Sequence, residues 1–410
     1  MKKMICLLLC LAMALAVCGC GGDDNDSTPG STAGTTEGTV PDTTAAPTIK
    51  QNTTLQLPMI AISMPLTVQK ASAEDGSVVF NTMFQDVALT IPDADNADPI
   101  ILDLLSRIDE NKGDTYALAN LAQSLYDGSE SWVPYYSNVT YSPARIDEKV
   151  ISLYGRVTSF FGGLHPTTLC ISANYDLATG NVLYLSDVLA GEDAGTALCQ
   201  AIIAKLTEIQ DKYYIYEGFE DAVYETYGSI FAEDAAPVET WFLSPTGLTV
   251  YFSTYEIAPY ASGPILVNIP YADLDGILLE DFFPASLPEN PSGTVYAELA
   301  QDVDLDYFTQ FAEAIINDGG ERVVLYSDKL VTNVTIETGS WSADGLTYTP
   351  TATVFYAASL SYQDAIMLET DFYGSMPSLR LSYASNGETH RFFITQSGAD
   401  GSIILLDDLT

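Results

Sequence analysis

The chain has 410 residues with 55 acidic and 15 basic side chains, and its formal charge is −40. A surface this negative repels nucleic acid and argues against a phosphate-binding role, whereas it favours cationic partners and solubility. Aromatic residues make up 11% of the chain, including 25 tyrosines, which is ample for two or three domains with hydrophobic cores.

Residues 1–19 are predicted to be a lipoprotein signal peptide. Lys2 and Lys3 precede an apolar run at 4–17 that is too short to span a bilayer. Gly19 stands directly before Cys20, with an aliphatic residue three places before the cysteine. This arrangement resembles the signal peptides of bacterial lipoproteins, in which the cysteine becomes the lipidated first residue. It implies a lipid on Cys20 that anchors the protein to the outer face of the bacterial cell membrane. The alternative is ordinary secretion with cleavage nearby.

Residues 20–54 are rich in Gly, Thr, Ser, Asp and Pro and have almost no large apolar side chains. Such a segment cannot bury enough surface to offset its chain entropy, so a disordered tether is expected. Removal of the signal peptide with its two lysines would leave a charge of about −42 on the mature chain.

Residues 55–130 are predicted to form a small α/β domain. Two strand-like runs at 58–69 and 78–92 precede a helical pattern at 99–126, which a break at 111–114 divides. Residues 135–283 are predicted to form a second, α+β domain with helices at 189–210 and within 213–231. Its expected strands lie at 137–142, 149–161, 167–176, 183–185, 240–243, 248–253 and 265–269, followed by a helical turn at 271–279.

A third, β-rich domain is predicted at 295–410. It is expected to begin with a helix whose apolar residues are Leu305, Phe308, Phe311, Ala312, Ile315 and Ile316. Strand-like runs follow at 323–326, 331–338, 346–356, 366–372, 379–383, 391–395 and 403–406. The predicted fold class is α+β, with antiparallel sheets, packed helices and several domains.

Motifs for catalysis are missing. His165 and His390 are the only histidines, and the sequence has no HExxH, GxSxG, P-loop or dinucleotide-binding motif. No metal, cofactor or catalytic residue is therefore predicted, and an enzyme is not favoured. Two carboxylates in one cleft could still serve a glycosidase, and 55 acidic residues guarantee some close pairs. A cell-wall-acting enzyme of unrecognised type remains the alternative.

Cys170 and Cys199 are the two cysteines beyond the signal peptide and the lipidation site. In an extracytoplasmic protein an even pair could form a disulfide, which would stabilise the fold by about 3 kcal/mol. Alternatively, each is a small buried hydrophobic residue, Cys170 in a strand and Cys199 in a helix.

Four motifs in the middle domain carry a resemblance to a known family. They are Gly-Gly-Leu-His-Pro at 162–166, the Tyr-Asp-Leu-Ala-Thr-Gly and Leu-Ser-Asp-Val-Leu pair within 175–189, Glu-Ile-Ala-Pro-Tyr-Ala at 256–261 and Ile-Pro-Tyr-Ala-Asp-Leu at 269–274. Over about 148–280 the chain resembles the extracellular domain of lysozyme-sensing anti-sigma factors. The same domain occurs in the non-catalytic region of some peptidoglycan deacetylases, and residues 55–127 look more weakly similar to the domain that precedes it there.

The resemblance implies a binding role, since the anti-sigma members bind lysozyme through loops of this domain. Carried over by motif, the candidate contacts are His165, Pro166, Glu256, Pro259 and Tyr260. The chain departs from these relatives because no spanning helix follows the signal peptide and no metal-binding catalytic domain is recognised. The alternative is that both loops are structural, with glycine and proline fixing turns while His165 and Glu256 satisfy backbone groups. The predicted function is a membrane-anchored binding module for a lysozyme-like cationic protein or for cell-wall glycan.

Overall fold

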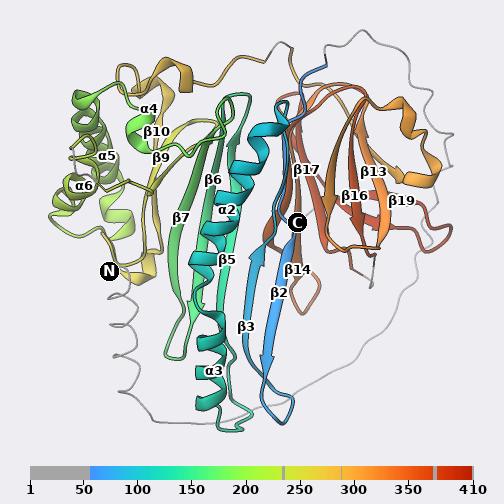
Figure 1. Ribbon diagram of the computed structural model, residues 1–410, viewed down its shortest axis with the longest axis horizontal. Coiled ribbons are helices and arrows are strands. Elements are labelled where there is room, and N and C mark those ends of the chain that lie inside the picture. Colours follow the sequence, from blue (N-terminus) through green and yellow to red (C-terminus); the bar gives the residue numbers. More distant parts are fainter. Residues whose placement is uncertain (1–55, 233–235, 288, 373–375, 409–410) are drawn as a thin grey trace. The chain divides into compact units, whose positions relative to one another are not determined.

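The computed structural model describes residues 56–232, 236–287, 289–372 and 376–408. Apart from Gly162–Leu164, these residues belong to one compact unit. Among the described residues, the unit contains four sheets, five α-helices and several short 3-10 helices (Figure 1). Antiparallel pairing dominates the sheets, so the predicted α+β class is confirmed. The predicted signal peptide, Cys20 and the tether lie outside the described residues.

A five-stranded sheet has the order β2-β3-β5-β6-β7. Its strands are β2 (Leu66–Ser72), β3 (Val78–Gln85), β5 (Tyr135–Ile146), β6 (Val150–Phe160) and β7 (Thr167–Asp176). Strands β3 and β5 pair in parallel, because α2 (Ala97–Lys112) and α3 (Thr115–Leu125) make the crossover between them. Ile100, Leu104 and Ile108 of α2 are buried at helical spacing against this sheet.

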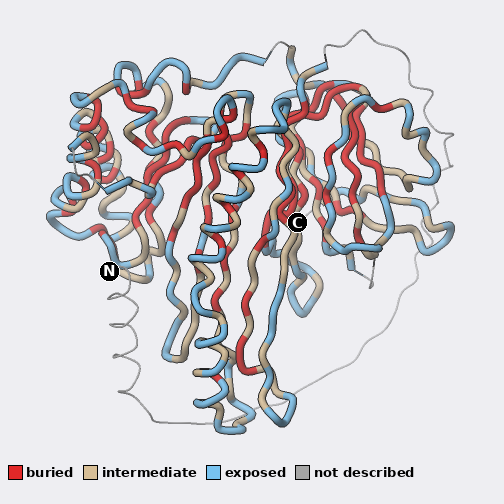
Figure 2. Tube along the Cα trace, viewed as in Figure 1, coloured by how far each residue is buried: buried red, intermediate tan, exposed pale blue. Residues whose placement is uncertain are grey.

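A three-stranded sheet has the order β10-β9-β8 and carries three helices. Its strands are β8 (Trp241–Leu243), β9 (Gly247–Phe252) and β10 (Ile265–Pro270), and the helices are α4 (Leu185–Val188), α5 (Glu192–Tyr213) and α6 (Phe219–Tyr227). Leu198, Ile202 and Leu206 of α5 form a fully buried stripe in the shared core, as the sequence pattern predicts (Figure 2).

Residues of the C-terminal part form two more sheets. The four-stranded sheet, in the order β11-β13-β16-β12, contains β11 (Val295–Leu299), β13 (Glu321–Ser327), β16 (Asp364–Thr370) and β12 (Gln310–Ile315). The seven-stranded sheet, in the order β19-β18-β17-β14-β15-β1-β4, contains β19 (Ile403–Asp407), β18 (Glu388–Gln396), β17 (Leu379–Ser385), β14 (Val331–Trp341), β15 (Tyr348–Leu360), β1 (Ala61–Ser63) and β4 (Ala88–Thr90). Apolar residues of both sheets form one core cluster.

Short 3-10 helices connect the strands. They lie at Ala94–Asn96, Tyr260–Ser262, Tyr271–Asp273, Glu280–Phe282, Ala300–Asp302 and Leu305–Tyr307. None of the helices in the described part of the chain is long and apolar enough to cross a lipid bilayer.

The helix predicted at the start of the third domain is wrong. Only Leu305–Tyr307 is a short 3-10 helix there, and Gln310–Ile315 forms strand β12, which pairs in parallel with β16. Ala312 and Ala314 face the core, while Phe311, Glu313 and Ile315 are exposed. Burial therefore alternates with a period of two residues, as in a strand. The apolar residues within Gln310–Ile315 that also fit a helical pattern lie on both faces of this strand.

The predicted domain boundaries do not follow the sheets. Strands β2 and β3 of the predicted domain 55–130 pair with each other and with β5 of the next domain. Strands β1 and β4 of the same region belong to the seven-stranded sheet, where β1 pairs with β15. The N-terminal segment therefore completes two sheets and is not a separate domain.

Candidate binding surface

The two loops singled out by the sequence meet through aromatic contacts. His165 precedes β7, and Tyr260 lies between β9 and β10. Their rings stack with centroids 3.7 Å apart and planes inclined by 20°. Tyr255 joins them, with its ring centroid 5.7 Å from that of Tyr260 and its hydroxyl oxygen 3.4 Å from Nε2 of His165. Residues about ninety positions apart in the sequence thus form one aromatic group, here called the His165–Tyr260 cluster (His165, Tyr255 and Tyr260).

The contacts of His165 are satisfied by one tautomer. Nδ1 lies 3.2 Å from the carbonyl oxygen of Pro166 and Nε2 faces the Tyr255 hydroxyl. With the proton on Nδ1, the ring donates to Pro166 and accepts from Tyr255, so both contacts are hydrogen bonds. Gly162 and Gly163 precede this residue with φ of 89° and 100°, a backbone conformation that favours glycine.

Backbone and hydroxyl hydrogen bonds hold the second loop beside the start of β7. The hydroxyl of Thr254 donates to the carbonyl oxygen of Thr168 at 3.3 Å. The backbone N–H of Cys170 donates to the hydroxyl of Ser253, also at 3.3 Å. Ile257 and Ala258 are buried and anchor the loop in the core of the three-stranded sheet. The loop therefore has a fixed base under its exposed residues.

Glu256 stabilises its own turn. Its carboxylate accepts a hydrogen bond from the backbone N–H of Ser253 at 2.7 Å. Burial raises the pKa of this carboxyl group, and the hydrogen bond from Ser253 opposes the increase. The side chain is still accessible to solvent. Among the candidate contacts, Glu256 thus matches the structural alternative most closely, whereas His165 and Tyr260 present ring faces beside each other.

The proline candidates flank the cluster and set its backbone. Pro166 is half-buried and supplies the carbonyl oxygen that faces His165. Pro259 has φ of −66° and stands at the N-terminal end of the 3-10 helix that carries Tyr260. Both residues act on the position of the aromatic rings next to them.

The suggested disulfide is not formed. Cys170 and Cys199 are both free and buried. They lie in different hydrophobic clusters, since Cys170 packs with Phe242 and Tyr251 while Cys199 packs in the core under α5. The thiol of Cys170 lies 3.0 Å from the hydroxyl of Tyr154. The alternative interpretation, a strand cysteine and a helix cysteine in the core, is the one observed.

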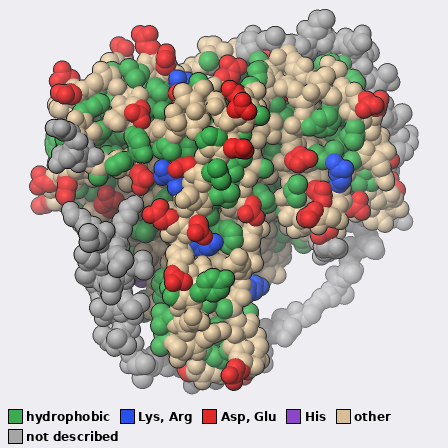
Figure 3. Space-filling model, in the orientation of Figure 1, with side chains coloured by type: hydrophobic (Ala, Val, Ile, Leu, Met, Phe, Trp, Pro, Cys, Tyr) green, Lys and Arg blue, Asp and Glu red, His purple; other side chains and the backbone are tan. Residues whose placement is uncertain are grey.

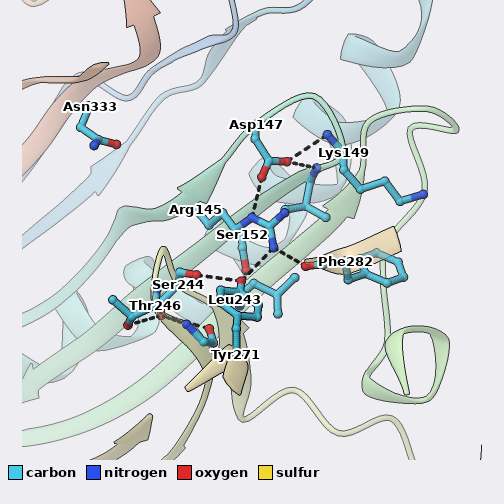
Figure 4. Close-up of polar contacts among 12 residues, drawn as sticks. Arg145, Asp147, Lys149, Ser152, Leu243, Ser244, Thr246, Tyr271, Phe282 and Asn333 are labelled. Carbon is cyan, nitrogen blue, oxygen red and sulfur yellow. Dashed lines mark hydrogen bonds and ion pairs between the residues drawn. The ribbon is translucent and has the colours of Figure 1, made fainter. Parts of the chain in front are cut away.

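A polar network around the buried Arg145 joins the five-stranded sheet to the three-stranded sheet, and no sequence motif predicts it (Figure 4). The guanidinium group of Arg145 pairs with Asp147 and donates to the carbonyl oxygen of Phe282 and, at 2.8 Å, to the hydroxyl of Tyr271. Tyr271 in turn donates to the carbonyl oxygen of Ser244 at 2.9 Å. The network is a structural joint, because each polar group in it is used by another protein group.

Within the described residues, no group of three or more His, Cys, Asp or Glu side chains is arranged to hold a metal ion. The His165–Tyr260 cluster is therefore the candidate binding surface.

One segment of the chain matches a known family model. Residues 186–272 match the family model described as "Protein of unknown function (DUF3298)". This segment contains Glu256, Pro259 and Tyr260 but not His165. No curated protein matches the chain.

Two solved structures of DUF3298 family proteins are similar to the chain. One, from Bacteroides fragilis, is 21% identical, and the match covers 54% of this chain and 94% of that one with a TM-score of 0.36. The other, from Pseudomonas aeruginosa, is 20% identical and covers 55% and 97% of the two chains with a TM-score of 0.37.

Proposed function

We propose that this protein is an extracytoplasmic binding module that holds a cationic, lysozyme-like protein at the cell envelope. The observation that carries the proposal is the stacking of His165 on Tyr260, which combines the two candidate loops into a single surface. Two of the four motifs that carry the resemblance to the lysozyme-sensing domain of anti-sigma factors lie in these two loops. Large rigid side chains with a polar tip dominate the binding energy of many interfaces, and tyrosine is one of them.

The charge of the molecule supports a cationic partner. On the face drawn in Figure 3, Asp and Glu side chains are spread over the surface and greatly outnumber Lys and Arg. A formal charge of −40 attracts a cationic protein at long range and raises its association rate at low salt. The short-range contacts of the aromatic cluster would then determine how long the complex lasts.

The central experiment measures binding of lysozyme to residues 56–410 by calorimetry and surface kinetics. Tyr260→Ala is expected to weaken binding by about 1–3 kcal/mol, mainly through faster dissociation. Raising the salt concentration should chiefly slow association. Tyr116→Ala is the matched control, because Tyr116 lies on α3 and is 85% exposed.

Two outcomes would overturn the proposed contact. One is an unchanged affinity in a well-folded Tyr260→Ala variant. The other is a loss of affinity that is matched by an equal loss of thermal stability, since Tyr260 would then be structural. Muropeptides titrated in parallel test cell-wall glycan as the ligand, and glycan binding without lysozyme binding would replace the proposed partner.

The proposed location depends on Cys20. Metabolic labelling with palmitate should label the wild type and the Cys18→Ala control, and the label should vanish in Cys20→Ala. The Cys20→Ala protein should also remain uncleaved or be released into the medium. Label that persists on Cys20→Ala would show that the anchor is elsewhere.

A further inference from the structure

A third segment lies beside the loop that carries Tyr255 and Tyr260, and no comparison or motif assigns it a role. It is residues 213–217, which are the last residue of α5 and most of the connection to α6. The backbone N–H of Tyr216 donates to the carbonyl oxygen of Ile257 at 2.9 Å. The hydroxyl of Ser262 donates to the carbonyl oxygen of Tyr213 at 2.6 Å. The connection is therefore fixed to the loop that carries Tyr255 and Tyr260.

The connection presents tyrosine rings to solvent on a buried anchor. Ile215 is 5% exposed and packs in the core, whereas Tyr214 and Tyr216 on either side of it are 74% and 45% exposed. Tyr255, on the loop that is hydrogen-bonded to the connection, is 56% exposed. Exposed single tyrosines are ordinary, but these three stand on two segments that are hydrogen-bonded to each other.

Two of these tyrosines have a strained backbone. Among the described residues, five non-glycine residues have a positive φ, and two of them are Asn, which tolerates this conformation better. The other three are Gln363, Tyr214 at φ 53° and Tyr255 at φ 73°. Tyr214 is the C-cap of α5, a position at which glycine is the usual residue. The ring of Tyr214 is 74% exposed and contributes little to packing, so this strained position points to a function for the ring.

Carboxylate groups beside the connection favour a cationic partner. Glu217, Glu220 and Asp221 are exposed at the start of α6. The nearest basic residue, Lys212, already lies over the ring of Tyr213, with its Nζ 4.8 Å from the ring centroid. Aromatic faces next to unneutralised carboxylates attract Lys and Arg side chains by cation–π and ionic interactions.

We infer that residues 213–217 are a second contact segment, which binds Lys or Arg side chains of a cationic protein through Tyr214, Tyr216 and Glu217. The inference rests on the proposed function and extends the surface from two loops to three. It separates long-range attraction, which the whole molecule supplies, from a local recognition element.

The test uses glycine substitutions that remove the ring and the strain together. Tyr214→Gly and Tyr255→Gly should keep most of the wild-type thermal stability, because glycine adopts a positive φ without steric strain and this offsets its larger loss of chain entropy on folding. Their affinity for lysozyme should nevertheless fall by about tenfold each. Tyr216→Ala and Glu217→Gln should also weaken binding, whereas Tyr116→Ala should not. Cytochrome c serves as a second cationic probe, and its weaker binding should be abolished by moderate salt.

The outcomes distinguish this inference from the proposed function. If the wild type binds lysozyme and Tyr260→Ala weakens it, but Tyr214→Gly and Tyr216→Ala bind normally, the second segment is wrong and the proposed function stands. If Tyr214→Gly loses affinity while Tyr260→Ala does not, the second segment is supported and the His165–Tyr260 contact is wrong. If neither lysozyme nor cytochrome c binds the wild type, both are wrong.

Discussion

The two cysteines in the described residues, Cys170 and Cys199, are both buried and free. Burial raises the pKa of the Cys199 thiol to about 11 and also raises that of Cys170, so neither thiol forms the reactive thiolate near neutral pH. Inertness follows from the surroundings of each sulfur atom.

A thiol count tests this description. Residues 56–410 contain two cysteines. A thiol reagent at pH 8 should react only slowly with the folded protein. After unfolding without reductant, it should react with two thiols per chain. A count of zero in the unfolded, non-reduced protein would mean that a disulfide forms after all.

Arg145 is the residue whose loss should harm the fold most directly. Its side chain is 4% exposed, and its removal would take one hydrogen-bond donor from Asp147, from Tyr271 and from the carbonyl oxygen of Phe282. Arg145→Ala is expected to lower the free energy of unfolding by about 3 kcal/mol. Urea denaturation measures this, with the exposed Arg322→Ala as the control that should change stability by less than about 0.5 kcal/mol. Equal effects of the two substitutions would show that the joint between the sheets contributes little.

The candidate site could be predicted only in part at this scale. The sequence and its resemblance named His165 and Tyr260, and the structure stacks them, but no spacing rule reveals a contact across about ninety residues. The sequence pattern predicts a helical region that includes Tyr214 and Tyr216. A run of tyrosines after a helix resembles ordinary core packing until the burial of Ile215 shows which rings face solvent.

At the scale of elements, the periodicity of a single segment predicts its helix or strand well, but it does not predict which distant strand it pairs with. The stripe on α5 and the strands β8, β9 and β10 lie close to where periodicity predicts them. Strand β12 was missed because its apolar residues also fit a helical period, and its partner β16 lies about fifty residues away. Local spacing cannot distinguish these cases, since the deciding hydrogen bonds are made by a distant strand.

The segment leading into β1 depends on a buried carboxylate. Asp364 accepts hydrogen bonds from the side chains of Gln56 at 3.0 Å and Gln310 at 2.9 Å, and from the backbone N–H of Ser361 at 2.7 Å. Burial raises its pKa, although these hydrogen bonds oppose the increase. A carboxyl group with a raised pKa in the folded state contributes most to stability below its unfolded pKa of about 4. That contribution is lost as the pH rises through the folded pKa.

Asp364→Asn tests this pH dependence. Between about pH 4.5 and pH 7.5, the stability of the wild type relative to Asp364→Asn should fall as the pH rises. Asp75 gives a control of opposite sign, because hydrogen bonds from Ser77 and Tyr126 lower its pKa. The stability of the wild type relative to Asp75→Asn should therefore rise with pH below about pH 4.5 and stay constant above it. Urea denaturation at several pH values measures both, and the same sign for the two variants would contradict the assignment for Asp364.

The molecule as a whole does not divide where its sequence seems to. Because β1 and β4 complete the seven-stranded sheet, a fragment of residues 291–408 would lack two strands and expose the edge of β15. This fragment is expected to aggregate or to lack near-ultraviolet circular dichroism, whereas residues 56–408 should give a sharp thermal transition. A soluble fragment with the native aromatic spectrum and a cooperative melt would show that the C-terminal sheets form an independent domain.

The position of β1 also determines how the fold carries mechanical load. A pull on the chain ahead of Gln56 meets the contact with Asp364 first and then runs along β1. That strand has an antiparallel partner on each side, so its hydrogen bonds to β15 and β4 resist the force together. At the other end of the same sheet, β19 pairs only with β18 and can peel away one bond at a time. Force applied ahead of Gln56 is therefore shared by two strand pairings, whereas force applied at β19 falls on one.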